Sequence, residues 1–485
     1  MNTIKGSGKV TTNGINGATG QYDVQPIALE DLARQIKGIP TAEIPEHVVK
    51  RGSKLRQSLF AAGLPWGFKS DDLTRVGWAI VFHTDESPEV RQALRPLIEH
   101  RRAQVGNDAL LKELDYISGE DATTWLVRSD VSWHGIEPTK VPFYLLWIGP
   151  PQRIPYEVTH EIDSDYCVGL LDFDTPQEYA AYAAGVIAYE TKATVENSRE
   201  AVFFGTRHPF DEATQLSADW LVTPIAEGTP GSSTTPAVGP IATSLGFRQR
   251  TLIGPAATRD ALLQTFDATR ATPSLLFTAS HGMVWPNGDA RQFISQGALL
   301  CQDWPGFGSV SPAHFVTGAD ISDNARVHGL ITFHFACFGG GTPARDLYSF
   351  ERGQAPPEIA PKAFTAALPR RLLAHPGGGA LACIAHVERA WGSSITGIGS
   401  SPQIRQFQRA VGQILVGQPV GLAVQEFNDM SATLSEVLSG LQGKVFQGIP
   451  VDDLALARAW MQRNDAAGFV LLGDPAVRLR ITDLV

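Results

Sequence analysis

Two apolar runs, each ending beside a reactive side chain, constrain this chain more than any other feature. The first covers residues 275–282 and ends in His281 and Gly282, and the second covers residues 330–337 and ends in Cys337. Short apolar runs bounded by turn residues are typical of strands buried in a parallel sheet. Open α/β sheets place their active sites at the carboxyl ends of such strands. We therefore expect the histidine and the cysteine to meet at one sheet edge, where they can serve as base and nucleophile.

The bulk properties narrow the class of protein. A chain of 485 residues is too long for one ordinary core, so we expect two or three domains. The net charge is -10 and no stripe of Lys and Arg stands out, so a nucleic-acid grip is not indicated. The four cysteines lack metal-type spacing and are too few for a disulfide framework, which suits a reducing compartment. The sequence shows neither a secretory signal nor an 18-residue apolar run, so we expect a cytoplasmic protein without a membrane span.

Strand-like and helix-like segments alternate along the chain, which predicts an α/β fold with a mostly parallel sheet. Strands are expected at residues 77–82, 143–149, 166–171, 201–205, 379–385 and within 469–476, and helices at 88–105, 175–192, 259–268, 363–374, 403–416 and 454–462. We expect a flexible N-terminal arm over residues 1–22, an N-terminal α/β subdomain over 23–195, and a catalytic α/β subdomain over 196–485.

The order of these motifs resembles the caspase-like (clan CD) cysteine peptidases, and within them the gingipain-type C25 family with its bacterial relatives. Residues 144–190 are similar to the end of that family's first subdomain, and the His-Gly and Ala-Cys strands are similar to its second. The segment 379–391 is similar to the one that lines the family's specificity pocket. The CHAT peptidases share the His-Gly and Ala-Cys elements. The resemblance implies a caspase/gingipain-like three-layer αβα fold with two tandem subdomains.

The resemblance also implies an activity, that of a cysteine endopeptidase. Cys337 would attack the scissile carbonyl, and His281 would assist it and then protonate the leaving amine. The N–H groups of Gly282 and Cys337 would form the oxyanion hole. Trp391 and Glu388 are the candidates for the substrate pocket, and the family favours a basic residue before the scissile bond (the P1 residue).

Several assignments stay open on the sequence alone. Asp211, Glu212 and Glu200 are all candidates to orient His281. His334 precedes Cys337 by three residues, and residues i and i+3 of a strand point to opposite faces, so we expect a packed histidine there. Mid-strand Cys383 is expected to be a core residue.

Cofactors, partners and competing functions complete the predictions. The chemistry requires no cofactor and no metal, although a structural calcium ion is compatible with the resemblance. The expected partners are a protein or peptide substrate and an activating sensor protein, with neither nucleic acid nor membrane. Residues 351–361 are a predicted site of self-cleavage. The alternatives are a catalytically silent interaction protein on the same scaffold and a thiol amidase that acts on small substrates.

Overall fold

The computed structural model describes residues 9–38, 69–131, 136–229, 237–346, 355–395 and 404–485. One ten-stranded sheet dominates the fold, in the order β5-β4-β6-β7-β18-β17-β14-β10-β8-β9. Its strands are β4 (Trp78–His83), β5 (Leu111–Tyr116), β6 (Tyr144–Ile148), β7 (Cys167–Leu171), β8 (Ser198–Gly205), β9 (Arg248–Ile253), β10 (Pro273–Ala279), β14 (Ile331–Phe335), β17 (Ala382–His386) and β18 (Phe469–Gly473).

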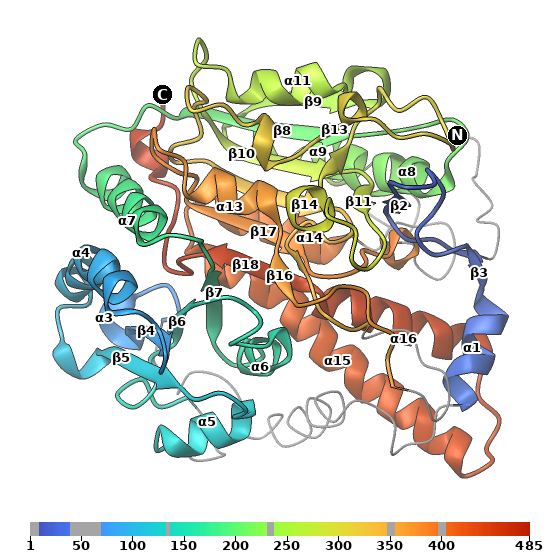
Figure 1. The fold of residues 1–485 in the computed structure, drawn as a ribbon, viewed down its shortest axis with the longest axis horizontal. Coiled ribbons are helices and arrows are strands. Elements are labelled where there is room, and N and C mark those ends of the chain that lie inside the picture. The colour runs from blue at the N-terminus through green and yellow to red at the C-terminus, as the bar shows by residue number, and fades with distance from the viewer. Residues whose placement is uncertain (1–8, 39–68, 132–135, 230–236, 347–354, 396–403) are drawn as a thin grey trace.

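The sheet consists of two parallel blocks joined by the last strand of the chain. Strands β4 to β7 are parallel to one another, and so are β8, β9, β10, β14 and β17. Strand β18 lies between β7 and β17 and is antiparallel to β17 (Figure 1). The sequence predicted sheets in two tandem subdomains, whereas one continuous sheet crosses the expected boundary between residues 195 and 196.

Helices cover both faces of this sheet, so the molecule has the predicted three layers, αβα (Figure 1). Within the described residues, the helices with at least five residues are α1 (Leu29–Gly38), α4 (Pro88–Val105), α5 (Ala122–Arg128), α6 (Tyr156–Ile162), α7 (Pro176–Thr191), α8 (Glu212–Leu216), α9 (Thr223–Glu227), α11 (Arg259–Leu263), α13 (Ala367–Leu373), α14 (Arg405–Leu415), α15 (Val420–Phe446) and α16 (Asp453–Ala467). A π-helix, Ser217–Val222, connects α8 to α9.

Two helix starts follow directly from the sequence. The side chain of Ser87 accepts a hydrogen bond from Val90 N–H at the start of α4. Thr175 and Glu178 form a capping box at the start of α7, with proline at the first helical position. Because these caps satisfy backbone N–H groups that the helix itself leaves open, they define where the helix begins. Both predicted helices are confirmed.

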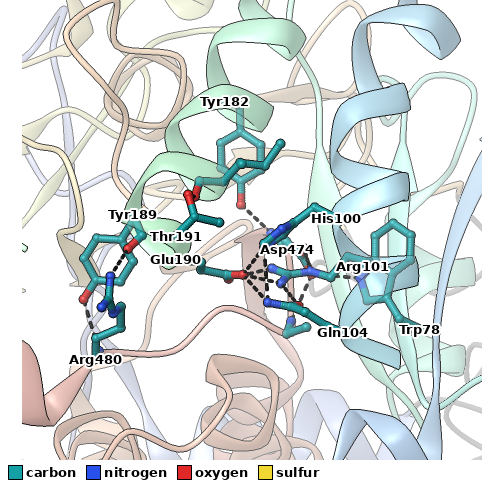
Figure 2. Close-up of polar contacts among 12 residues, drawn as sticks. Trp78, His100, Arg101, Gln104, Tyr182, Tyr189, Glu190, Thr191, Asp474 and Arg480 are labelled. Carbon is teal, nitrogen blue, oxygen red and sulfur yellow. Dashed lines mark hydrogen bonds and ion pairs between the residues drawn. The ribbon is translucent and has the colours of Figure 1, made fainter. Parts of the chain in front are cut away.

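A buried ion cluster fastens the first block of the sheet to the last strand (Figure 2). Arg101 of α4 pairs with Asp474, which follows β18, at 2.8 Å and with Glu190 of α7 at 2.6 Å. The indole of Trp78 donates to Asp474 at 3.0 Å, and Gln104 donates to Glu190 at 2.7 Å. Burying charges is costly unless each is paired and hydrogen-bonded. Here α4, α7 and the turn after β18 supply the partners.

The N-terminal segment contradicts the expected flexible arm where the structure describes it. Strand β1 (Lys9–Val10) pairs with β3 (Ile27–Ala28), and β2 (Gly14–Asn16) pairs with β11 (Gly282–Val284) in a small four-stranded sheet that also contains β12 (Leu299–Leu300) and β13 (Phe315–Val316). Asn13 and Ile15 are completely buried. The Gly-, Thr- and Asn-rich sequence shows no apolar periodicity, but backbone pairing with an existing strand does not require one.

None of the helices in the described ranges is both long and apolar enough to cross a membrane. Within the same ranges, no group of three or more His, Cys, Asp or Glu side chains is placed to hold a metal ion. A structural calcium ion stays a prediction.

Candidate active site

The register of two neighbouring strands brings the candidate histidine and cysteine to one sheet edge. Strands β10 and β14 are parallel, and Ala279 lies opposite Phe335 at their carboxyl ends. His281 and Cys337 each follow two residues later, and both are completely buried. A Cβ atom at Gly282 would lie 1.9 Å from the carbonyl oxygen of Cys337. Only glycine permits the two turns to pack this closely.

His281 is held by a carboxylate from a third element. Its Nε2 atom lies 2.6 Å from Oδ2 of Asp211, and both side chains are completely buried. Asp211 is the residue that caps α8. Of the three acids that the sequence left open, Asp211 therefore lies against the histidine, while Glu200 pairs with Arg248 at 3.2 Å.

The other ring nitrogen of the histidine is available for chemistry. No hydrogen-bond partner for Nδ1 of His281 exists among the residues that the structure describes. A ring that is anchored through Nε2 and open at Nδ1 is the arrangement that a general base requires, because one nitrogen sets the orientation and the other exchanges the proton.

Asp211 is kept ionised in its buried position. Burial alone raises the pKa of this carboxyl, but the charge of His281 and hydrogen bonds from His281, Thr214 and Tyr22 outweigh it and hold the pKa well below its usual range. The hydroxyl of Tyr22 donates to Oδ1 of Asp211. Burial, with the neighbouring Asp211 charge, raises the pKa of Tyr22, so its hydroxyl stays a donor.

Two backbone N–H groups converge on a single oxygen beside the cysteine. The amides of Gly282 and Cys337 donate to the carbonyl oxygen of Asn13 at 2.8 and 3.2 Å. The backbone N–H of Asn13 donates to the carbonyl oxygen of Ala390 at 2.8 Å, and Thr12 forms an antiparallel bridge with Trp391. The segment around Asn13 thus crosses the site as an extended peptide, with its carbonyl in the predicted oxyanion hole.

The cysteine sits on a sharply turned backbone. Phe338 and Glu388 have φ angles of 59° and 71°, a conformation that costs a non-glycine residue on the order of 1 kcal/mol. The amide of Phe338 donates to the carbonyl of Glu388 at 2.5 Å. This bond ties the turn after Cys337 to the segment that follows β17.

The thiol of Cys337 is covered in this structure. Burial raises the pKa of the Cys337 thiol, although the Ala390 amide, which donates to Sγ at 3.2 Å, acts in the opposite direction. A Cβ atom at Gly14 would lie 3.1 Å from Sγ. The thiol is therefore protonated in the covered site, and a base must take its proton when it reacts.

The two predicted pocket residues lie in different surroundings. Trp391 packs edge-to-face on Trp460, with ring centroids 5.8 Å apart, in an apolar cluster that includes Val10. The carboxylate of Glu388 is buried and lies 2.7 Å from the guanidinium of Arg389. Trp391 is therefore packed beneath the N-terminal segment, whereas Glu388 shares the single charge of Arg389 with Asp23 and Asp346, each 2.9 Å from the guanidinium.

The expected packing residues behave as packing residues. His334 is hydrogen-bonded to Thr278 at 2.8 Å, and burial lowers the pKa of His334 to about 4. Cys383 is completely buried in β17. These two predictions are confirmed.

Sequence reasoning missed the residues that the N-terminal segment contributes to the site: Asn13, Tyr22 and Asp23. Asp23 pairs with Arg389 at 2.9 Å. A usable signal was present, because the segment contains two Asn-Gly pairs within five residues, at positions 13–14 and 16–17. Such pairs mark sharp backbone turns, but they do not reveal what the turn packs against.

Comparisons with known proteins find remote structural likenesses. No protein-family model matches the chain, and the search of curated proteins gives no match. One similar solved structure is described as a protease, with 10% identity and a TM-score of 0.44 over 83% of this chain and 78% of that chain. Another is gingipain R, an Arg-specific cysteine proteinase, with 12% identity and a TM-score of 0.39 over 86% of this chain and 80% of that chain.

A third similar structure is the Saccharomyces cerevisiae separase–securin complex, with 9% identity and a TM-score of 0.30 over 69% of this chain and 15% of that chain. These values are too low to assign an activity. The functional conclusion rests on the site itself.

Proposed function

We propose that this chain is a cysteine endopeptidase in which Cys337 is the nucleophile, His281 the general base and Asp211 the residue that orients His281. One observation carries the proposal. A peptide carbonyl accepts hydrogen bonds from both Gly282 and Cys337 amides at the site of the thiol, which is the geometry that stabilises the oxyanion of acyl transfer.

Each group then has one role in the reaction. The Cys337 thiol passes its proton to Nδ1 of His281 and its sulfur attacks the carbonyl carbon. Asp211 keeps the ring in place through Nε2 and stabilises the imidazolium that forms. His281 returns the proton to the leaving amine, and water then hydrolyses the thioester. No cofactor enters this scheme.

The contacts of the cleft favour a polypeptide over a small amide as the substrate. The site binds backbone on both sides of the Asn13 carbonyl: Ala390 accepts from the backbone N–H of Asn13, and β11 pairs with residues 14–16. Adding an extended peptide to strand edges is a recurring mode of peptide recognition, and a small amide would use little of this surface.

The test is cleavage of a diverse fluorogenic peptide library, together with labelling by a peptidyl acyloxymethyl ketone. We expect wild type to cleave and to be labelled at Cys337, while Cys337→Ala and His281→Ala do neither. Cys383→Ala is the matched control, because it removes a buried thiol from a neighbouring strand and should leave both signals in place. Equal labelling of wild type and Cys337→Ala would contradict the proposal and leave the silent-scaffold alternative.

We extend the proposal to a cytoplasmic enzyme that acts on a protein substrate after activation by a partner. All four cysteines are free thiols, which fits a reducing compartment, and the covered thiol fits an enzyme that awaits a signal. Trapping thiols at lysis and counting alkylated cysteines by mass spectrometry checks the compartment. Finding these cysteines oxidised in freshly lysed cells would contradict it.

A further inference from the structure

We propose that this chain cleaves its own Asn13–Gly14 bond and that its specificity pocket selects asparagine as the P1 residue. The inference rests on the proposed peptidase function and adds to it the substrate class and a processing site. It is carried by the residues that bind the N-terminal segment in the cleft.

Backbone hydrogen bonds single out one bond for cleavage. The carbonyl of Asn13 occupies the oxyanion hole, while the next carbonyl, that of Gly14, accepts from Asp23 at 3.0 Å instead. The backbone N–H of Asn13 donates to the carbonyl oxygen of Ala390 at 2.8 Å. The carbonyl carbon presented to Cys337 is therefore that of Asn13, and the leaving amine is that of Gly14.

The surroundings of the Asn13 side chain match the NH2 group of its amide, while Oδ1 has no hydrogen-bond partner among the described residues. The side chain is completely buried, and its Nδ2 donates to the carbonyl of Ser280 at 3.4 Å. A Cβ atom at Gly392 would lie 2.6 Å from Oδ1 of Asn13, so the side chain of Asn13 ends directly against the glycine backbone. Aspartate would place two acceptor oxygens in this pocket against a backbone carbonyl, and that mismatch discriminates against it.

The position after the bond requires a small residue. A Cβ atom at Gly14 would lie 3.1 Å from Sγ of Cys337 and 3.3 Å from Val284. Glycine meets this condition without displacing either neighbour. The cleft thus fits the Asn-Gly pair on both sides of the scissile bond.

The second Asn-Gly pair, Asn16–Gly17, makes different contacts from the first and serves as a comparison. The side chain of Asn16 caps a turn by accepting from Ala18 and Thr19 at 2.9 and 3.2 Å, and its carbonyl accepts from Gly20 at 2.6 Å. This pair lies at the end of β2, and the carbonyl of Asn16 accepts within its own turn and not from the N–H groups of Gly282 and Cys337. It therefore supplies an internal control three residues from the proposed site.

Contacts on both sides hold the scissile bond in place. Before it, Val10 is buried in a cluster with Trp391 and Trp460. After it, the hydroxyl of Tyr22 donates to Asp211, and Asp23 pairs with Arg389. Fixing both flanks converts the attack into an intramolecular step with a high effective concentration of the bond.

The reaction balances without an added reagent except water. The Cys337 sulfur forms a bond to the Asn13 carbonyl carbon, and the thiol proton passes through His281 to the nitrogen of Gly14 as the C–N bond breaks. Water then adds to the thioester, regenerating the thiol and leaving a carboxylate on Asn13. The chain retains a new amino terminus at Gly14. The predicted cleavage within residues 351–361 stays a separate prediction, and residues 351–354 lie outside the described residues.

The test uses intact mass and N-terminal sequencing of the purified full chain during incubation. We expect wild type to lose residues 1–13 with a rate constant that does not change on hundredfold dilution, and Cys337→Ala to stay whole. Asn13→Asp should slow the loss by at least about 10²-fold, since sites built around one hydrogen-bonding group reject its mismatched analogue strongly. Asn16→Asp keeps the oxygen that caps the turn and should process like wild type. Thermal melting of each variant verifies folding.

A second arm supplies residues 10–16 as a quenched fluorogenic peptide, with asparagine or aspartate at the position of Asn13. Cleavage of the asparagine peptide alone is expected. Wild type that cleaves library peptides through Cys337, yet keeps its Asn13–Gly14 bond and ignores the asparagine peptide, would overturn the inference and leave the peptidase function standing. Loss of residues 1–13 from Cys337→Ala as well would also overturn it, as spontaneous Asn-Gly cleavage. Absence of labelling and of every cleavage would remove the peptidase function itself.

Discussion

Two buried acid–base clusters in this molecule use similar groups for different ends. Around Arg101, the guanidinium, Glu190 and Asp474 have all their charges paired with one another and with neighbouring donors (Figure 2). Around His281, Asp211 anchors one ring nitrogen and the other has no partner in the described part of the chain. A cluster that satisfies itself completely stabilises the fold, whereas one that keeps a group in reserve beside a nucleophile is equipped for chemistry.

The largest expected effect is on the rate of peptide cleavage, which depends on the His281 cluster and not on the Arg101 cluster. Asp211→Asn should lower kcat/KM for peptide cleavage by up to about 10⁴-fold, because the amide no longer holds the ring in the required tautomer or stabilises the imidazolium. The free energy of unfolding should change far less than this barrier. Asp219→Asn is the control, since Asp219 pairs with Arg207 at the surface at 2.8 Å. A kcat/KM of Asp211→Asn within tenfold of wild type would remove Asp211 from the mechanism.

The converse substitution addresses the Arg101 cluster. Arg101→Met should lower the free energy of unfolding by about 3–5 kcal/mol, because it leaves two carboxylates buried without their partner. Arg95→Met on the same helix removes only a partly exposed pair with Glu113 and should cost less than about 1 kcal/mol. Denaturant unfolding measures both, and kcat/KM of the folded Arg101→Met protein should match wild type. Equal stability losses in the two variants would contradict the assigned role.

The stability that the Arg101 cluster contributes should depend on pH through Glu190. Burial alone raises the pKa of Glu190, but the charge of Arg101 and hydrogen bonds from His100, Arg101 and Gln104 lower this pKa to about 2. A carboxyl with a lowered folded-state pKa stabilises the fold above its unfolded value and loses that contribution as pH falls. The loss should therefore run from about pH 4.5 down to about pH 2 and amount to about 3 kcal/mol.

Acid unfolding followed by circular dichroism checks this expectation. Glu190→Gln should be less stable than wild type at neutral pH and should show a shallower loss of stability between these pH values. An identical acid profile in the two proteins would show that Glu190 does not contribute to it. Asp211 titrates in the same direction, so part of the slope persists in the variant.

The smallest expected effect concerns the hydrogen bond that Tyr22 of the N-terminal segment donates to Asp211. Tyr22→Phe removes the donor to Asp211 and should cost about 1.5–3 kcal/mol of stability in the uncut chain, the range for hydrogen bonds to charged groups. Measured in the Cys337→Ala background, the segment remains attached throughout. If Tyr22→Phe leaves that stability unchanged, the hydroxyl does not help to hold the segment.

The sequence predicted the parts of this molecule that depend on local pattern. The apolar runs of β10 and β14 and the caps of α4 and α7 are visible because burial and helix geometry impose short periods and specific cap residues. Of the predicted helices, 363–374 and 403–416 correspond to the shorter α13 and α14. The longest helix in the described part of the chain, α15, was not predicted. It contains glycines at positions 421, 440 and 443 and several serines, so its stability comes from packing more than from helix propensity.

The sequence by itself determined which strand ends would carry the cysteine and the histidine, because parallel strands bury apolar runs and expose their carboxyl ends at one edge. Only the tertiary structure decided which acid meets His281, since Asp211 lies 70 residues away along the chain and three acids fitted the pattern equally well. It also decided that residues 9–23 cross the site. Backbone hydrogen bonds fix that path. Because nearly every residue has the same backbone groups, the pattern of side chains does not predict these hydrogen bonds.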